Sequence, residues 1–142
     1  MKFSCEKALL SAAVSTASRA VAPKSSIPAL EGILIEAGAT LRLTGYNLET
    51  GIQATVPAEI RDTGSLVLSA RLFSEIVRKM PDDMVTFVSN GYNVNIKCGL
   101  SEFNILATDP EEFPELPEVD QQNALTLPQP VLRSMISQTL FA

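Results

Sequence analysis

The spacing of apolar residues changes from about two to about 3.6 residues and back again along the first third of the chain. Residues 1–5 alternate between apolar and polar side chains, which predicts a half-buried strand. In residues 6–20 the apolar side chains recur every three or four positions among many alanines, which predicts a helix. After a loop marked by two prolines, alternation returns in three short runs. These runs predict strands at residues 32–37, 40–46 and 49–57.

The same order of elements recurs in the second third of the chain. A strand is expected at residues 64–69 and a helix at 70–80, whose apolar side chains share one face. Asn90-Gly91 is the strongest short hairpin signal in the sequence, and Gly99-Leu100 is a second turn candidate. These turns separate three further predicted strands, at residues 84–89, 93–98 and 101–107.

The pattern starts a third time near the C-terminus. Residues 109–122 are rich in proline and acidic side chains and are expected to form a solvated linker. A strand is expected at residues 124–127 and a helix at 129–139, with a stripe formed by Val131, Leu132, Met135, Ile136 and Leu140. Because no strands follow to cover that stripe, we expect the helix to pack on another chain or to fold back on the preceding residues.

Two complete strand–helix–three-strand units are therefore expected, at residues 1–60 and 61–122. The fold class is α+β: two β-α-β-β-β units with both helices on one side of a mostly antiparallel sheet. One unit alone would leave its helix half covered, so residues 1–122 are expected to form one domain. Residues 123–142 are interpreted as the truncated start of a second domain.

Composition narrows the possible chemistry. The chain has no histidine, which removes the commonest general base and the Ser-His and Cys-His nucleophiles. Cys5 and Cys98 form no metal-binding or redox motif and are expected to be buried thiols. The chain shows neither a signal-peptide core nor an apolar run long enough to span a membrane, so we expect a cytoplasmic protein with no membrane partner.

The net charge of −5 is unevenly distributed. The three helical segments with their flanks, residues 6–24, 70–79 and 128–142, hold seven basic and two acidic side chains, whereas the remainder holds four basic and fourteen acidic ones. A positive helical layer on an acidic body can follow phosphates without reading bases. The same charges could also be ordinary solvated helix faces.

Five segments, taken in order, resemble one known family, the β subunit (β sliding clamp) of bacterial DNA polymerase III. They are Met1-Lys2-Phe3, the run from Ile27 to Ile35, the run from Leu41 to Glu49, Ser69-Ala70-Arg71-Leu72-Phe73 with Met80-Pro81, and Phe103 followed by the run from Asp109 to Pro114. The resemblance covers the N-terminal domain and the start of the second. It implies a DNA-clamp fold and a non-catalytic processivity factor of DNA replication. Such a factor needs no cofactor and no metal.

The resemblance also assigns residues. Lys24 occupies a loop where the family usually has a DNA-contacting arginine, and Arg71 matches a DNA-contacting arginine at the start of the second helix. Arg78 is an auxiliary candidate on the same face. Phe103 and Ile105 match the strand that meets the partner protomer, with Leu72 and Ile76 nearby. Burial in the domain's own core is the alternative for these four apolar residues.

The partners implied are duplex DNA, bound independently of sequence, and a second protomer that closes a dimeric ring. DNA polymerase III and the clamp loader are implied through parts of the protein mostly absent from these 142 residues. Two other classes stay open. One is an α+β protein-interaction module with no DNA role. The other is an enzyme with carboxylates at Asp82-Asp83 or in the acidic run at residues 109–118, although a turn and a linker explain these better.

Overall fold

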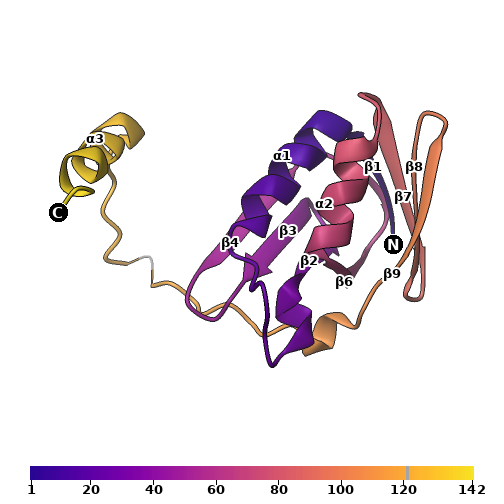
Figure 1. The fold of residues 1–142 in the computed structure, drawn as a ribbon, viewed down its shortest axis with the longest axis horizontal. Helices are drawn as coiled ribbons and strands as arrows, with labels where there is room; N and C mark the ends of the chain where they lie inside the picture. Colours follow the sequence, from indigo (N-terminus) through magenta and orange to yellow (C-terminus); the bar gives the residue numbers. More distant parts are fainter. Residues whose placement is uncertain (121) are drawn as a thin grey trace.

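The computed structural model describes residues 1–120 and 122–142, and the first unit has the predicted order of elements (Figure 1). Its strands and helix begin and end within about two residues of the predicted positions. A short 3-10 helix occupies part of the predicted proline loop. The elements are β1 (Lys2–Glu6), α1 (Lys7–Ser18), η1 (Pro28–Glu31), β2 (Gly32–Ala37), β3 (Leu41–Tyr46) and β4 (Gly51–Val56).

The second unit repeats this order, and one additional strand joins the two units. That strand, β5 (Glu59–Asp62), pairs with β1 and was missed in the sequence because only one of its four residues is apolar. The second unit and the C-terminal region consist of β6 (Gly64–Ser69), α2 (Ala70–Lys79), β7 (Met84–Asn90), β8 (Asn93–Cys98), β9 (Ser101–Leu106), the 3-10 helix η2 (Pro110–Glu112) and α3 (Gln129–Thr139).

The strands form two antiparallel sheets rather than one. The five-stranded sheet has the order β5-β1-β7-β8-β9, and the four-stranded sheet has the order β4-β3-β2-β6. The first strand of each unit thus pairs in the sheet of the other unit, β1 with β7 and β6 with β2. This exchange explains why the two units fold as one body. The α+β class with mostly antiparallel strands is confirmed, but the expected single sheet is divided in two.

Both helices of the repeat lie side by side over the strands, as predicted (Figure 1). Helix α1 contacts α2, β3 and β4. Ser69 caps the N-terminus of helix α2: its Oγ accepts a hydrogen bond from the Leu72 amide at 3.5 Å. This serine satisfies one of the backbone donors that a helix start leaves free.

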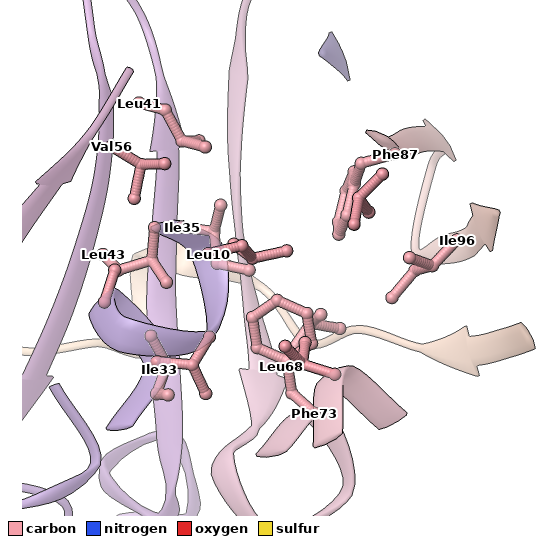
Figure 2. Close-up of a cluster of buried hydrophobic side chains, with 14 of the residues drawn as sticks. Leu10, Ile33, Ile35, Leu41, Leu43, Val56, Leu68, Phe73, Phe87 and Ile96 are labelled. Atoms are coloured by element: carbon pink, nitrogen blue, oxygen red, sulfur yellow. The ribbon is translucent and has the colours of Figure 1, made fainter. Parts of the chain in front are cut away.

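One hydrophobic core lies between the helices and the inner faces of both sheets (Figure 2). Leu10 of α1 and Phe73 of α2 are fully buried in it, and the Phe3 and Phe87 rings stack with centroids 4.6 Å apart. Gly45 allows a close approach of helix and sheet, because a Cβ at this position would overlap the Ala17 carbonyl oxygen. The close packing of α1 on β3 therefore depends on glycine at position 45.

The segment after β9 is not the solvated linker that its composition predicts. We call residues 109–118 the strap, because they run across the outer face of the four-stranded sheet. Thr108 first exchanges backbone hydrogen bonds with Val67, at 2.9 and 3.2 Å. Phe113 is then 6% exposed in a second apolar cluster, and Leu116 packs beside it. Apolar side chains within the acidic run explain the docking. Residue 121 of the predicted linker lies outside the described residues.

The structure contradicts the strand expected near the C-terminus and the possibility that the following helix folds back on the domain. The strand expected at residues 124–127 does not form: these residues are exposed and belong to no strand. Helix α3 has the predicted bounds, but it does not fold back: all its residues are exposed, and it stands apart from the sheets (Figure 1).

Candidate nucleic-acid interface

The exposed surface of α1 and α2 is the side of the molecule on which basic side chains were expected to gather. Arg71 and Arg78 are exposed on α2, and Arg19 and Lys24 are exposed on the segment that follows α1. Small and apolar residues that recur every three or four positions keep the opposite sides of both helices in the core. The helical surface is thus rigidly supported, and its charged side chains point away from the sheets.

Arg71 and the loop that carries Lys24 border the same hollow. Arg71 lies in the first turn of α2 and makes an exposed ion pair with Glu75 at 3.6 Å. A hollow of about 570 Å³ is lined by Arg71 together with Pro23, the residue before Lys24. Residues 24 and 71, far apart in sequence, are therefore brought to one region at the N-terminal end of α2. That end also carries the positive side of the helix dipole, which favours anions.

Arg78 borders a different hollow, the groove between α1 and α2. This groove of about 330 Å³ is lined by four serines, Ser11, Ser15, Ser18 and Ser74. The Ser18 and Ser74 hydroxyls share a hydrogen bond at 3.3 Å across the groove. The sequence analysis did not predict this row of serines, although serines spaced four and three residues apart on α1 indicated it. Hydroxyls beside a guanidinium can bind phosphate oxygens directly or through water.

Fewer basic side chains are available on the helical surface than the count from the sequence indicated. Lys7 is not free, because its Nζ lies 2.9 Å from Asp82 Oδ1 and its side chain is only 17% exposed. Arg133 sits on α3, away from the other two helices. The outer faces of the sheets carry basic residues too, and three of these are paired with a carboxylate: Arg42 with Glu36, Arg61 with Glu59 and Lys97 with Glu102. The contrast between the two sides persists after this correction.

The four candidate interface residues lie in two different settings. Phe103 and Ile105 are half-buried on β9, which pairs only with β8 and forms one edge of the five-stranded sheet. Leu72 is 40% exposed on α2, whereas Ile76 packs against the core. An edge strand offers unpaired backbone groups to another chain. Leu106, 70% exposed on the opposite face of β9, was not anticipated.

Three of the carboxylates considered for catalysis have structural roles. Asp82 pairs with Lys7, and Asp83 Oδ1 accepts a hydrogen bond from the Met84 amide at 2.7 Å. Asp109 accepts bonds from the Glu111 amide and the Tyr92 hydroxyl, and these two bonds lower the pKa of its carboxyl. In the described residues no group of histidine, cysteine or acidic side chains is arranged to hold a metal ion.

The two cysteines are buried, as expected. Burial, with the nearby Cys98 as a lesser cause, raises the pKa of Cys5 to about 12. The Cys98 thiol donates a hydrogen bond to the Pro81 carbonyl oxygen at 3.3 Å, and burial raises its pKa as well. Both thiols are thus protonated near neutral pH. In the described part of the chain, no helix has the length and apolar content to cross a bilayer.

A sequence model of the family described as DNA polymerase III beta subunit, N-terminal domain, matches residues 1–117. The beta sliding clamp of Bacillus subtilis (strain 168) is 37% identical over 152 aligned positions, which cover 100% of this chain and 40% of that protein. The beta sliding clamp of Staphylococcus aureus (strain N315) is 34% identical, with the same coverage. The chain thus spans about two fifths of the length of these relatives.

Solved structures give the same result for the fold. A putative DNA polymerase III beta subunit from Eubacterium rectale superposes with a TM-score of 0.94 at 35% identity, covering 100% of this chain and 40% of the other. The DNA polymerase sliding clamp from Bacillus subtilis superposes with a TM-score of 0.93 at 36% identity, with the same coverage. The fold of the two units therefore matches about two fifths of each of these chains.

Proposed function

Since the chain belongs to the family of the DNA polymerase III beta subunit and matches its N-terminal domain, we propose that it supplies the first domain of a sliding clamp. In this role it is a non-enzymatic processivity factor that helps to encircle duplex DNA in the cytoplasm and tether the replicative polymerase. The observation that carries the proposal is the helical surface, whose exposed basic side chains lie opposite outer sheet faces on which Arg42, Arg61 and Lys97 are each paired with a carboxylate.

Lys24, Arg71 and Arg78 are the side chains we propose to contact phosphates. They are exposed on a rigid surface without interleaved aromatic side chains. Such a surface attracts the DNA backbone but offers nothing to stack on single-stranded bases. Contact of this kind is independent of sequence and leaves a ring free to slide. Lys24 supplies a point charge rather than the planar fork of an arginine, which suits loose contact.

The second protomer is proposed to meet this domain along β9, with Phe103, Ile105, Leu72 and Ile76 as apolar contacts. Support comes from the unpaired edge of β9 and from the half-exposure of Phe103, Ile105 and Leu72. Ile76 packs mainly on the core and is the weakest of the four. Residues 1–122 form the first domain in this proposal, and residues 123–142 begin the second. Sites for the polymerase and the clamp loader would then lie mainly in the rest of the ring.

The decisive experiment compares basic residues on the two sides of the domain. In the full-length clamp, Lys24→Ala with Arg71→Ala removes two charges from the helical surface. Arg42→Ala with Arg61→Ala removes two charges from the sheet side and serves as the matched control. Binding to linear duplex DNA is measured by fluorescence anisotropy over a range of salt concentrations.

The first pair is expected to reduce the slope of log affinity against log salt by about 0.9 for each phosphate that the protein no longer neutralises. The control pair leaves the slope unchanged. If the two double variants had equal slopes of log affinity against log salt, DNA attraction would not be localised on the helices, and the proposal would fail. Absence of nonspecific DNA binding at low salt in the unmodified full-length protein would favour a protein-interaction module with no DNA role.

The interface proposal has its own test. Ile105→Asp places a charge on the inner face of β9 and is expected to convert a dimeric ring to monomers at micromolar concentration, measured by sedimentation equilibrium. Asn104→Asp adds a charge on the other face of the same strand and is expected to leave the dimer intact. A dimer that survives Ile105→Asp would place the protomer contact elsewhere.

A further inference from the structure

A hollow lies on the side away from the helices, between the strap and the outer face of the four-stranded sheet. Its volume is about 880 Å³. A second hollow of about 390 Å³ shares Glu36, Arg42 and Ser65 with it and extends it to the β2–β3 turn. The two together form one continuous groove across the sheet, on the face that does not contact α1.

The floor of this groove is defined by the strand register. Leu34, Thr44 and Gln53 are direct neighbours on three adjacent strands and form one row. Ser65, Glu36 and Arg42 form the next row. Phe113 and Leu116 of the strap close the apolar side. The groove thus has an apolar wall beside a polar floor.

The charge around the larger hollow is strongly negative. Glu111, Glu115 and Glu118 extend from the strap, and Glu36 adds a fourth carboxylate from the floor. Arg42 is the one basic side chain among its lining residues, and its Nε already lies 3.1 Å from Glu36 Oε2. A ligand in this groove meets an excess of carboxylates, which favours cations and opposes nucleic acid.

Thr44 contributes a buried polar side chain to the floor of the groove. The residue is 0% exposed and lines the hollow from its central strand. Its Oγ1 finds no hydrogen-bond partner within the described part of the chain. Buried hydroxyls are nearly always satisfied, and leaving one without a partner is unfavourable. A donor or acceptor supplied by a bound molecule would complete this site.

We propose that the groove between the strap and the four-stranded sheet binds an extended, lysine- or arginine-bearing peptide segment of a partner protein. The basic side chains of the peptide face Glu111, Glu115 and Glu118, one apolar side chain contacts Leu34 and Phe113, and a backbone polar group bonds to Thr44. The continuous length and the mixed apolar and acidic lining fit a peptide better than a single ion. This site goes beyond the proposed function, because it lies on the face opposite the DNA-facing helices.

The test uses the 142-residue chain and a fluorescein-labelled, lysine-rich peptide of about eight residues with one central leucine, a length that suits an extended segment across the sheet. A peptide with glutamate in place of lysine is the ligand control. Glu111→Gln with Glu115→Gln removes two carboxylates from the groove. Glu112→Gln with Glu49→Gln removes two exposed carboxylates that do not line it. Thermal denaturation first verifies that both double variants keep the stability of the parent.

Affinity from fluorescence anisotropy and amide chemical shifts from nuclear magnetic resonance are the two readouts. We expect the groove variant to bind the lysine peptide about threefold to tenfold more weakly, and the matched control to bind it as the parent does. Peptide-induced shifts should gather at Thr44, Gln53 and Ser65. Equal weakening in both variants, shifts centred elsewhere, or no preference for lysine over glutamate would each overturn the proposal.

Discussion

Helices α2 and α3 have similar lengths and each carries an apolar stripe, yet only the stripe of α2 is buried. In α2 the apolar side includes Phe73 and Val77, which are 0% and 1% exposed. In α3 the corresponding stripe is open, with Val131 46% and Ile136 52% exposed. The periodic pattern is enough to form each helix, but burial requires packing partners: α2 packs on α1, β2 and β6, whereas α3 makes no comparable contacts among the described residues.

The two helices also begin differently. Ser69 caps α2 with its side chain, whereas α3 starts after Pro128 without a side-chain cap. Short helices are marginal in water unless tertiary packing stabilises them. The comparison therefore predicts that equivalent changes in the two helices have unequal consequences.

The largest difference is expected from truncation of a large apolar side chain. Phe73→Ala removes a fully buried ring and should lower the unfolding free energy by about 3–5 kcal/mol. Ile136→Ala should change it by less than about 0.5 kcal/mol, because the side chain is half exposed. Urea denaturation of the 142-residue chain measures both. A comparable decrease from Ile136→Ala would mean that α3 packs on the sheets in solution.

Thiol reactivity gives the next largest contrast. Cys5 and Cys98 are buried and their pKa values are raised, Cys5 to about 12, so the reactive thiolate is scarce below pH 9. Cysteine introduced by Ser137→Cys on exposed α3 should react with a disulfide reagent at pH 8 about 100-fold or more faster than either native thiol. Denatured protein provides the control in which all the thiols react alike. Fast labelling of Cys5 in the native chain would contradict the buried core.

Removal of the helix cap gives the smallest effect of the three. Ser69→Ala should lower the unfolding free energy by about 0.5–1 kcal/mol, at the low end for a capping residue because the Oγ to Leu72 amide distance is 3.5 Å. Ser134→Ala in the interior of α3 is the matched control and should leave the transition unchanged. Thermal denaturation resolves the two. An unchanged midpoint for Ser69→Ala would show that packing alone holds the start of α2.

Local patterns in the sequence predicted the elements well and their partners poorly. The turns at Asn90-Gly91 and Gly99-Leu100 are confirmed, with Gly91 and Gly99 in the left-handed region at φ +57° and +56°. The division into two sheets was not predicted, because alternation reveals which face of a strand is buried but not which strand lies beside it. The exchange of β1 and β6 between units is a property of topology alone.

For the candidate site too, the sequence predicted features within one helix but not contacts between residues far apart in the chain. Helical spacing alone placed Arg71 and Arg78 on the face of α2 opposite Phe73 and Val77. The structure agrees, because the two arginines are exposed and the two apolar residues are buried. The ion pair of Lys7 with Asp82 joins residues 75 positions apart and had no local signal. The docking of the strap was obscured by its acidic residues, although Phe113 marked the point of contact.

The most direct measurement is to determine which side of this domain touches DNA. A photoreactive benzoylphenylalanine replaces Ser15, exposed on α1, or Thr55, exposed on the outer face of β4, in the full-length clamp loaded on circular duplex DNA. We predict a crosslink to DNA from position 15 and none from position 55. Crosslinks from position 55 alone, or from both positions equally, would contradict the assignment of the helical surface to DNA.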